Sequence, residues 1–288
     1  IRLTRPGAAG NHIRPAGDDL HPGTEVISPG TVVTPAHVGL LTTVGVDALR
    51  VFRRPVVGVL STGDELVSVG TPLGAHQIFD SNRPQLLAAV TAAGFTAVDL
   101  GRVGDDAERI AEAVELGAAR CDALITSGGV SMGEHDLVRV VLDRVGAMRW
   151  MQVAIKPAKP FAFGSVPGPD RPVPVFGLPG NPVSSLVSFE LFARPGLRAM
   201  AGHPHPYRRE FRAVAASEFR RRSDGKTHFV RVRSSVGEDG TLQVAPSGAQ
   251  GSHQLSGSAA ADALAVLPDG DGVATGGHLT VTFLDGDH

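Results

Sequence analysis

The chain has 288 residues, a formal net charge of −2 and a single cysteine, Cys121. The near-neutral charge excludes a general basic surface for nucleic acid, and one cysteine excludes a disulfide framework. No signal peptide and no apolar run long enough to span a bilayer is visible. We therefore expect a soluble, cytoplasmic protein with no nucleic-acid or membrane partner.

Residues 1–50 are rich in glycine and proline and predict a small satellite region rather than a core. Its helical pattern covers residues 35–44, with Thr34 as N-cap and Gly45 as the terminating residue. The sequence opens with isoleucine inside this turn-rich region. We expect the region to be the remnant of a longer N-terminal part.

Residues 51–203 alternate short apolar runs with amphipathic segments. The expected strands are 56–60, 96–100, 123–125, 150–155, 161–165 and 173–178, and the expected helices start after Asn82, Asp105, Asp136 and Pro182. This alternation predicts an α/β domain of three layers, with a mostly parallel sheet covered by helices on both faces. Ligands of such sheets bind at the carboxyl ends of the strands.

Residues 204–288 have a different pattern, because their helical signals stop. The expected strands are 211–215, 228–232, 242–245, 263–266 and 279–283, joined by Gly, Asp and Ser turns. Without a helix of any length, this pattern predicts a small all-β, barrel-like domain. The run Arg220-Arg221-Arg222 within it predicts a solvated turn.

The segment 122–136, DALITSGGVSMGEHD, has the strongest local signal for a binding site. It predicts a buried strand, a Gly/Ser loop and a helix start. Successive N–H groups of such a loop form an anion-binding nest, and Ser127 and Ser131 suit hydrogen-bond donors rather than nucleophiles. The acids Glu134 and Asp136 beside this nest suggest a metal ion between carboxylates and oxyanion.

Acidic turns recur at the other strand ends, at Glu65, Asp80 and Asp105. Taken singly, each acid is more typical of a helix N-cap than of a ligand, and Asp80 and Asp105 suit capping best. Several carboxylates at one sheet edge would instead suit Mg²⁺, which binds through one or two carboxylates, waters and phosphates.

Lys156 and Lys159 are two of only three lysines among 27 basic side chains. In a chain that otherwise uses arginine, paired lysines between prolines favour a site for a phosphate or another oxyanion. The alternative is a pair of solvated loop lysines. His135 lacks the second histidine of a zinc helix motif, and no serine-histidine-aspartate arrangement is visible.

Five motifs together resemble one known family, the molybdopterin molybdenumtransferases, which include bacterial MoeA and the E domain of gephyrin. They are STGDEL at Ser61–Leu66, IFDSN at Ile78–Asn82, TSGGVSMGEHD at Thr126–Asp136, IKPAKPFAFG at Ile155–Gly164 and GLPGNPVSS at Gly177–Ser185. They occur in the family's order. The segment Asn11–Asp19 resembles the strand pair by which the family's chain re-enters from an N-terminal lid.

The resemblance implies a molybdopterin-binding α/β domain at 51–203, a C-terminal β-barrel domain at 204–288 and a linker remnant at 1–50 that lacks most of the lid. It implies insertion of molybdate into adenylylated molybdopterin, with Mg²⁺ as cofactor and release of AMP. It also implies a homodimer whose site is completed by the partner's lid. The adenylyltransferase and the enzymes that accept the cofactor are its candidate protein partners.

The resemblance also implies roles for single residues. Catalytic roles fall on Asp19, Glu65, Asp105, Asp136, Lys156 and Lys159, with Glu65, Asp105 and Asp136 as the metal ligands. Cofactor binding falls on Thr62, Gly63, Ser127, Gly128, Gly129, Ser131, Pro179, Pro182 and Ser252. Gln152 departs from the family, where many members have lysine, and this weakens the expected positive charge at the molybdate subsite.

Two other functions remain open at this point. The sister adenylyltransferase shares the α/β domain, but it usually has GGTG where this chain has Gly128–Ser131, and it lacks the barrel. A non-catalytic scaffold of the gephyrin type would use the barrel or the dimer surface to bind a protein partner. The sequence does not distinguish molybdate from tungstate, and it assigns no role to Glu134 and His135.

Overall fold

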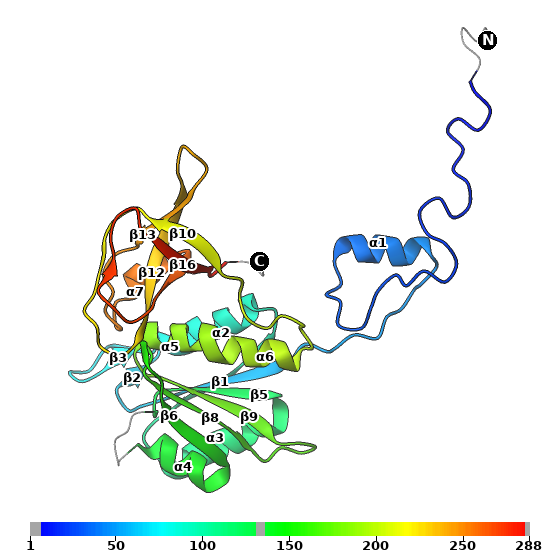
Figure 1. The fold of residues 1–288 in the computed structure, drawn as a ribbon. Helices are drawn as coiled ribbons and strands as arrows, with labels where there is room; N and C mark the ends of the chain where they lie inside the picture. The colour runs from blue at the N-terminus through cyan, green and yellow to red at the C-terminus, as the bar shows by residue number, and fades with distance from the viewer. Residues whose placement is uncertain (1–6, 131–135, 286–288) are drawn as a thin grey trace. The chain divides into compact units, whose positions relative to one another are not determined.

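A computed structural model describes residues 7–130 and 136–285 (Figure 1). The chain forms two units, residues 1–51 and 52–288. The first unit contains helix α1 (Pro35–Thr43), and the Thr34 hydroxyl accepts from the His37 N–H at its start, as expected for the N-cap. In the described part of this unit only Leu41 is buried, so the unit has no core of its own.

The second unit begins with a mixed sheet in the strand order β4-β1-β5-β9-β8-β6. Its strands are β1 (Val56–Thr62), β4 (Thr96–Val103), β5 (Ala123–Ser127), β6 (Ala147–Gln152), β8 (Pro160–Val166) and β9 (Val173–Leu178). Strands β4, β1, β5 and β9 run parallel, whereas β8 and β6 follow as antiparallel neighbours. The predicted α/β class with a mostly parallel sheet is confirmed.

Helices cover both faces of this sheet (Figure 1). Their bounds are α2 (Asn82–Ala92), α3 (Ala107–Arg120), α4 (Leu137–Val145), α5 (Pro182–Ser188) and α6 (Arg194–Met200), with a π-helical turn at Phe189–Ala193 between the last two. Helices α3 and α4 lie on one face and α2, α5 and α6 on the other. Within the described ranges, no helix has the length and apolarity needed to cross a lipid bilayer.

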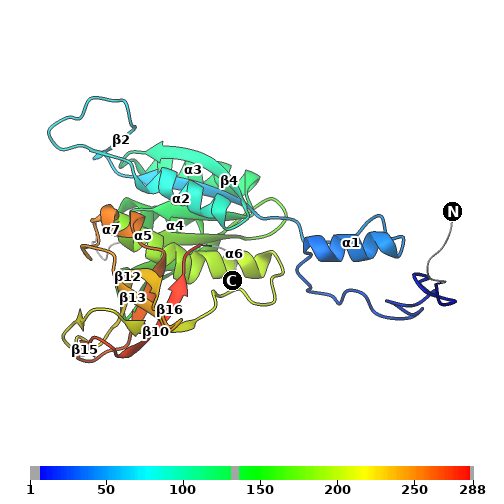
Figure 2. The same ribbon diagram turned by 90° about the horizontal axis from the view of Figure 1, so that it is seen from above.

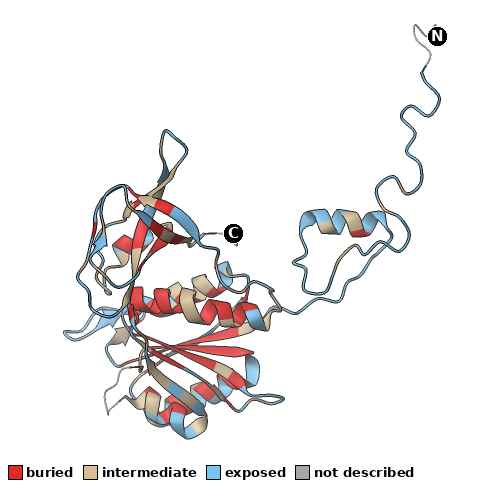
Figure 3. Cartoon of the chain, in the orientation of Figure 1, coloured by how far each residue is buried: buried red, intermediate tan, exposed pale blue. Residues whose placement is uncertain are grey.

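The strand sequences explain why the sheet is buried on both faces. Val57 and Val59 of β1 belong to the core under α2 and α6, whereas Leu60 belongs to the core under α3 and α4. In β5, Ile125 and Leu124 divide in the same way. Successive side chains of a strand point to opposite faces, so these continuous apolar runs fill two cores at once. Figure 3 shows the buried residues concentrated in the sheet and its covering helices.

The C-terminal region forms the predicted barrel, closed in the order β13-β10-β16-β14-β12 with β12 paired back to β13. Its strands are β10 (Phe211–Ala215), β12 (Thr227–Val236), β13 (Leu242–Pro246), β14 (Ala263–Leu267) and β16 (His278–Phe283). In the same region a short pair joins β11 (Phe219–Arg220) to β15 (Gly272–Val273). A second short pair, β2 (Leu66–Val67) with β3 (Ile78–Phe79), belongs to the α/β part. The expectation of no helix here is wrong in one place, because α7 (Leu255–Ala259) interrupts the strands.

A shared apolar cluster packs the barrel against the α/β part. Ile155, Val183, Val187 and Leu264 come from both parts and are all buried. Ile155 belongs to β7 (Ile155–Lys156), which pairs with β12 of the barrel. Figures 1 and 2 show the barrel on the side of the sheet that carries α5 and α6. The loops at this junction are therefore held by packing from both sides.

The Asp122 side chain is bonded to the start of β1, at the amino end of the parallel strands. Its carboxylate accepts hydrogen bonds from Arg53, from the Val56 N–H at 2.8 Å and from Arg171 at 3.0 Å. Burial alone would raise the pKa of Asp122, but these bonds outweigh it and hold the pKa below its ordinary value of 3.8.

Asp122 should therefore make stability depend on pH. Because its pKa is lower in the folded than in the unfolded chain, its contribution is fully present above about pH 4 and is lost as pH falls through the folded pKa. We expect Asp122→Asn to cost about 1–2 kcal/mol at pH 7 and progressively less toward pH 3. Urea unfolding of both proteins across this range measures it, and a difference that does not change with pH would contradict the assignment.

Candidate functional site

Loops at the carboxyl ends of four strands, β1, β4, β5 and β9, line one cavity of about 760 Å³. It brings together most of the residues predicted for the site: Thr62, Gly63, Glu65, Asp105, Ser127, Gly128, Gly129, Asp136 and Pro179. These loops are far apart in sequence and meet because parallel strands end at the same sheet edge. The cavity therefore lies where the α/β topology predicts a ligand.

The Gly/Ser loop after β5 differs in one respect from the predicted anion nest. Gly128 and Gly129 both have left-handed backbone conformations, with φ of 95° and 68°. The Gly128 N–H, however, donates to the Leu178 carbonyl at 3.1 Å, which ties the loop to the end of β9. This N–H is therefore engaged within the protein, and the predicted run of N–H groups open to an anion is wrong at Gly128.

The three proposed metal ligands line the cavity but do not form a ready-made metal centre. Among the residues that the structure describes, no three His, Cys, Asp or Glu side chains are close enough to hold a metal ion. Asp136 is the N-cap of α4 and accepts from the Arg139 N–H at 3.4 Å. Carboxylates at a cavity wall fit a Mg²⁺ held by one or two of them together with substrate phosphates.

The other acidic turns separate into caps and cavity residues. The N-cap position of α2 is Ser81, and Asp80, one residue before it, makes the capping bond, because its Oδ1 accepts from the Arg83 N–H at 3.1 Å. At α3 the cap is Asp106, which accepts from Glu108 and Arg109 N–H groups at 3.0 and 3.1 Å. The expected capping role of Asp105 is therefore wrong by one residue, because the helix starts at Ala107. Asp105 lines the cavity instead.

The lysine pair lies outside the lining of this cavity. Lys156 and Lys159 are both exposed, and Pro160, next to them, reaches the cavity. Strand pairing places Lys156 beside His228 of β12, and Lys156 lines a second cavity of about 630 Å³. The lysines therefore do not line the same cavity as the acidic residues, although Pro160, next to Lys159, does.

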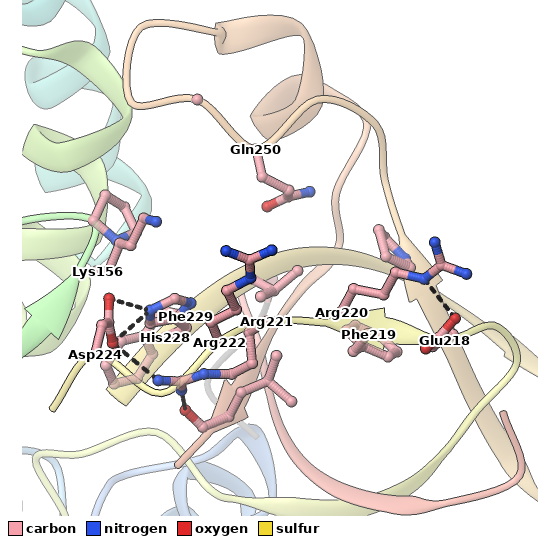
Figure 4. Close-up of a pocket in the computed structure, with 15 residues that line it drawn as sticks. Lys156, Glu218, Phe219, Arg220, Arg221, Arg222, Asp224, His228, Phe229 and Gln250 are labelled. Atoms are coloured by element: carbon pink, nitrogen blue, oxygen red, sulfur yellow. Dashed lines mark hydrogen bonds and ion pairs between the residues drawn. The ribbon is translucent and has the colours of Figure 1, made fainter. Parts of the chain in front are cut away.

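The second cavity lies on the barrel and is lined by many charged groups (Figure 4). The His228 ring and the Asp224 carboxylate pair at 3.1 Å near Lys156, and the Arg220–Glu218 pair lies at the other end. The side chain of Arg221 is only 2% exposed and binds Asp269 at 2.7 Å. The prediction of a solvated arginine turn is therefore wrong for Arg221.

The remaining predicted residues lie around these cavities or outside the described part. The Pro182 carbonyl accepts from Gln85 at 3.0 Å, and the Ser252 carbonyl accepts from the Val183 N–H at 3.0 Å, so both sit at the start of α5. Asp19 is exposed in the first unit. Ser131, Glu134 and His135 lie outside the described residues, and Gln152 is exposed opposite Pro160.

Sequence reasoning missed Asn82, the first residue of α2. It was treated as part of a helix cap, although it belongs to a motif that carried the family resemblance. Asn82 is 8% exposed, lines the main cavity and bonds to both Ser127 and Gly180. The signal available in the sequence was an amide side chain at a strand-to-helix junction, which suits a link between loops.

Arg231 was also missed. It is 1% exposed, and its Nη2 donates to the carbonyls of Ala249 and Gly251 at 2.7 and 3.4 Å. In the described part of the chain, its Nε and Nη1 have no hydrogen-bond partner, and burial lowers its pKa. An arginine inside the apolar run of β12 was the available signal, since buried cations normally have a partner.

Two family models cover most of the second unit. A "Probable molybdopterin binding domain" matches residues 58–199, and a "MoeA C-terminal region (domain IV)" matches residues 203–284. Among solved structures, a MoeA protein from Pyrococcus horikosii matches with a TM-score of 0.76 and 28% identity. That match covers 94% of this chain and 64% of the other.

Curated relatives agree with these matches. A molybdopterin molybdenumtransferase from Haemophilus influenzae is 35% identical over 278 residues, which are 94% of this chain and 66% of the relative. Molybdopterin molybdenumtransferase 1 from Mycobacterium tuberculosis is 36% identical, covering 99% of this chain and 67% of the relative. The chain thus spans about two thirds of the length of these relatives, and it belongs to the molybdopterin molybdenumtransferase family.

Proposed function

We propose that this chain inserts molybdate into adenylylated molybdopterin and releases AMP. The observation that carries the proposal is the single cavity where Glu65, Asp105 and Asp136 meet the Gly128-Gly129 loop, in a chain of this family. A pterin nucleotide joined by a pyrophosphate needs apolar and backbone surface for its rings and polar groups for its phosphates. This cavity offers both along one sheet edge.

The reaction breaks a phosphoanhydride bond, so charge on the phosphates must be neutralised and the groups held in line. When Mg²⁺ is bound, it supplies this neutralisation, and one or two of Glu65, Asp105 and Asp136 would hold it together with the phosphates. The loops at Thr62-Gly63, at Ser127–Gly129 and at Pro179 would orient the nucleotide. Pro182, beside them, would keep the last loop stiff.

Molybdate is a compact dianion, and we propose that Lys156 contributes to its binding. The second cavity adds His228 to this lysine, and the buried Arg231 lies beneath the adjoining 249–251 loop. Ser252 lies at the start of α5, where its carbonyl accepts from the Val183 N–H, and the assignment of Lys159 to the same subsite rests on the family resemblance. Arg231 is a buried cation whose Nε and Nη1 have no partner in the described part of the chain, and such a group favours an oxyanion nearby.

The molybdate dependence of AMP release tests this part of the proposal. We expect Lys156→Gln to raise the molybdate KM about tenfold, the value of one charge-assisted bond, with little change in the KM for adenylylated molybdopterin. Lys226→Gln is the matched control, because this lysine faces Asp224 at 3.8 Å and does not line the cavity. Equal molybdate KM values for the two variants would exclude Lys156 from the subsite.

The oligomeric state, the cellular location and the domain boundaries are part of the same proposal, and they rest on the family resemblance. We propose a cytoplasmic homodimer in which the partner's lid completes the site together with Asp19. The domains are 1–50, 51–203 and 204–288. The adenylyltransferase and the cofactor-accepting enzymes are the proposed protein partners. Sedimentation of the chain would measure the dimer, and a monomer at micromolar concentration would contradict it.

A further inference from the structure

The Asn82 side chain links two of the loops that line the main cavity. Its Nδ2 donates to the Ser127 hydroxyl at 2.8 Å and to the Gly180 carbonyl at 2.6 Å. Ser127 ends β5 and Gly180 follows β9, so one amide group spans the ends of two neighbouring strands. Asn82 and Ser127 are both buried, at 8% and 2% exposure.

The Gly180 carbonyl decides which way the Asn82 amide points. A carbonyl oxygen only accepts, so the group facing it must be the NH₂ end of the amide and not its oxygen. The same NH₂ group faces Ser127, and Ser127 must therefore accept from Asn82. The amide orientation follows from the contact to Gly180 and not from the serine.

A serine hydroxyl has one hydrogen, and accepting from Asn82 leaves that hydrogen for another acceptor. The described residues provide no protein acceptor for the Ser127 O–H, and Ser127 lines the cavity. At the same time the Asn82 Oδ1 is buried without a partner in the described part of the chain. A reversed amide would place its oxygen against the Gly180 carbonyl oxygen and leave its NH₂ group buried without an acceptor. The unpaired Oδ1 therefore belongs to the less costly of the two orientations.

We propose that Asn82 is a positioning residue that makes Ser127 a hydrogen-bond donor into the cavity, for an anionic oxygen of the bound nucleotide. This inference rests on the proposed function, since it assumes that a phosphate occupies the cavity. Asn82 acts through Ser127 and contributes no charge. Its effect is to select, before the ligand arrives, the one hydroxyl orientation that an oxyanion requires.

The test uses Asn82→Asp and AMP as the probe. At pH 8 the new carboxylate only accepts, so the Ser127 O–H turns toward it and the cavity loses a donor. We expect AMP to bind about tenfold more weakly than to the wild type, the value of one hydrogen bond to a charged group. Lowering the pH protonates the carboxyl, which can donate again. The ratio of variant to wild-type Kd should therefore fall toward one near pH 5. The new carboxylate would also repel the Gly180 carbonyl and the AMP phosphate at pH 8, so the double variant with Ser127→Ala shows how much of the loss passes through Ser127.

Ser127→Ala keeps the test decisive if Asn82→Asp does not fold. It should weaken AMP binding about tenfold at every pH, and the double variant should lose less than the product of the two single losses, because both changes remove the same donor. Gln85→Ala is the matched control. It removes a bond from α2 to the same loop, at Pro182, and should leave the Kd within about twofold of the wild type.

The outcomes separate the two proposals. Wild-type binding of AMP with unchanged affinity in Ser127→Ala would overturn the role of Asn82 and leave the proposed function standing. Losses that multiply in the double variant, or a ratio for Asn82→Asp that does not depend on pH, would also overturn it. A wild-type chain that binds neither AMP nor adenylylated molybdopterin would overturn the proposed function and this inference with it.

Discussion

Replacing Asp136 with asparagine is expected to slow AMP release at least about 100-fold while leaving stability near that of the wild type. The Asp136 carboxylate lines the cavity and also caps α4. Asparagine caps a helix as well as aspartate does, but it has no charge to place beside a metal ion or a phosphate. Asp136→Ala should lose the same rate and, in addition, about 1 kcal/mol of stability. Single-turnover AMP release and urea unfolding measure the two effects.

Asp106 supplies the control for this experiment. It caps α3 with two hydrogen bonds, and it does not line the cavity. Asp106→Ala should therefore cost about 1 kcal/mol of stability without slowing AMP release more than about twofold. If Asp136→Asn released AMP within threefold of the wild-type rate, the Asp136 carboxylate would have no role in the reaction.

The second large effect is expected for Gly129→Ala, which should reduce the free energy of unfolding by about 3 kcal/mol. Gly129 has φ of 68°, and a Cβ there would lie 2.3 Å from the Cβ and Cγ2 of Val138 in the first turn of α4. The change would therefore combine backbone strain with a clash against a buried residue. It should also move the start of α4, where Asp136 lies, and weaken AMP binding.

Gly94→Ala separates the cost of backbone strain from the cost of the clash with Val138. Gly94 has φ of 87° at the end of α2, and a Cβ there would meet nothing within 4 Å. Its substitution should cost only the backbone strain, about 1 kcal/mol. Urea unfolding of both variants gives the difference. Equal costs for the two glycines would show that α4 adapts to the new methyl group without strain.

Local patterns in the sequence predicted the elements well. The runs around Val57 and Ile125 are apolar on both faces, which is typical of strands buried in a three-layer sheet, and they form β1 and β5. The change of pattern after residue 203 predicted the barrel. The cap of α3 was displaced by one residue because Asp105 and Asp106 are chemically the same, and only the start of the helix distinguishes them.

The location of the site at the carboxyl ends of the strands could be predicted from the sequence, but the contacts between its loops could not. Glu65, Asp105 and Asp136 follow different strands, and parallel topology alone brings their loops to one cavity. Lys156 lines another cavity because β7 pairs with β12, about 70 residues later in the chain, and no local pattern encodes that pairing. The contact of Asn82 with Ser127 and Gly180 is hidden for the same reason.

The most direct test of the proposed function compares two reactions of the same chain. Adenylylated molybdopterin, Mg²⁺ and molybdate are supplied in one reaction, and free molybdopterin, Mg²⁺ and ATP in the other. The proposed function predicts AMP release in the first that requires molybdate, and no adenylylated product in the second. Adenylylated product in the second reaction, or no molybdate-dependent AMP in the first, would contradict it.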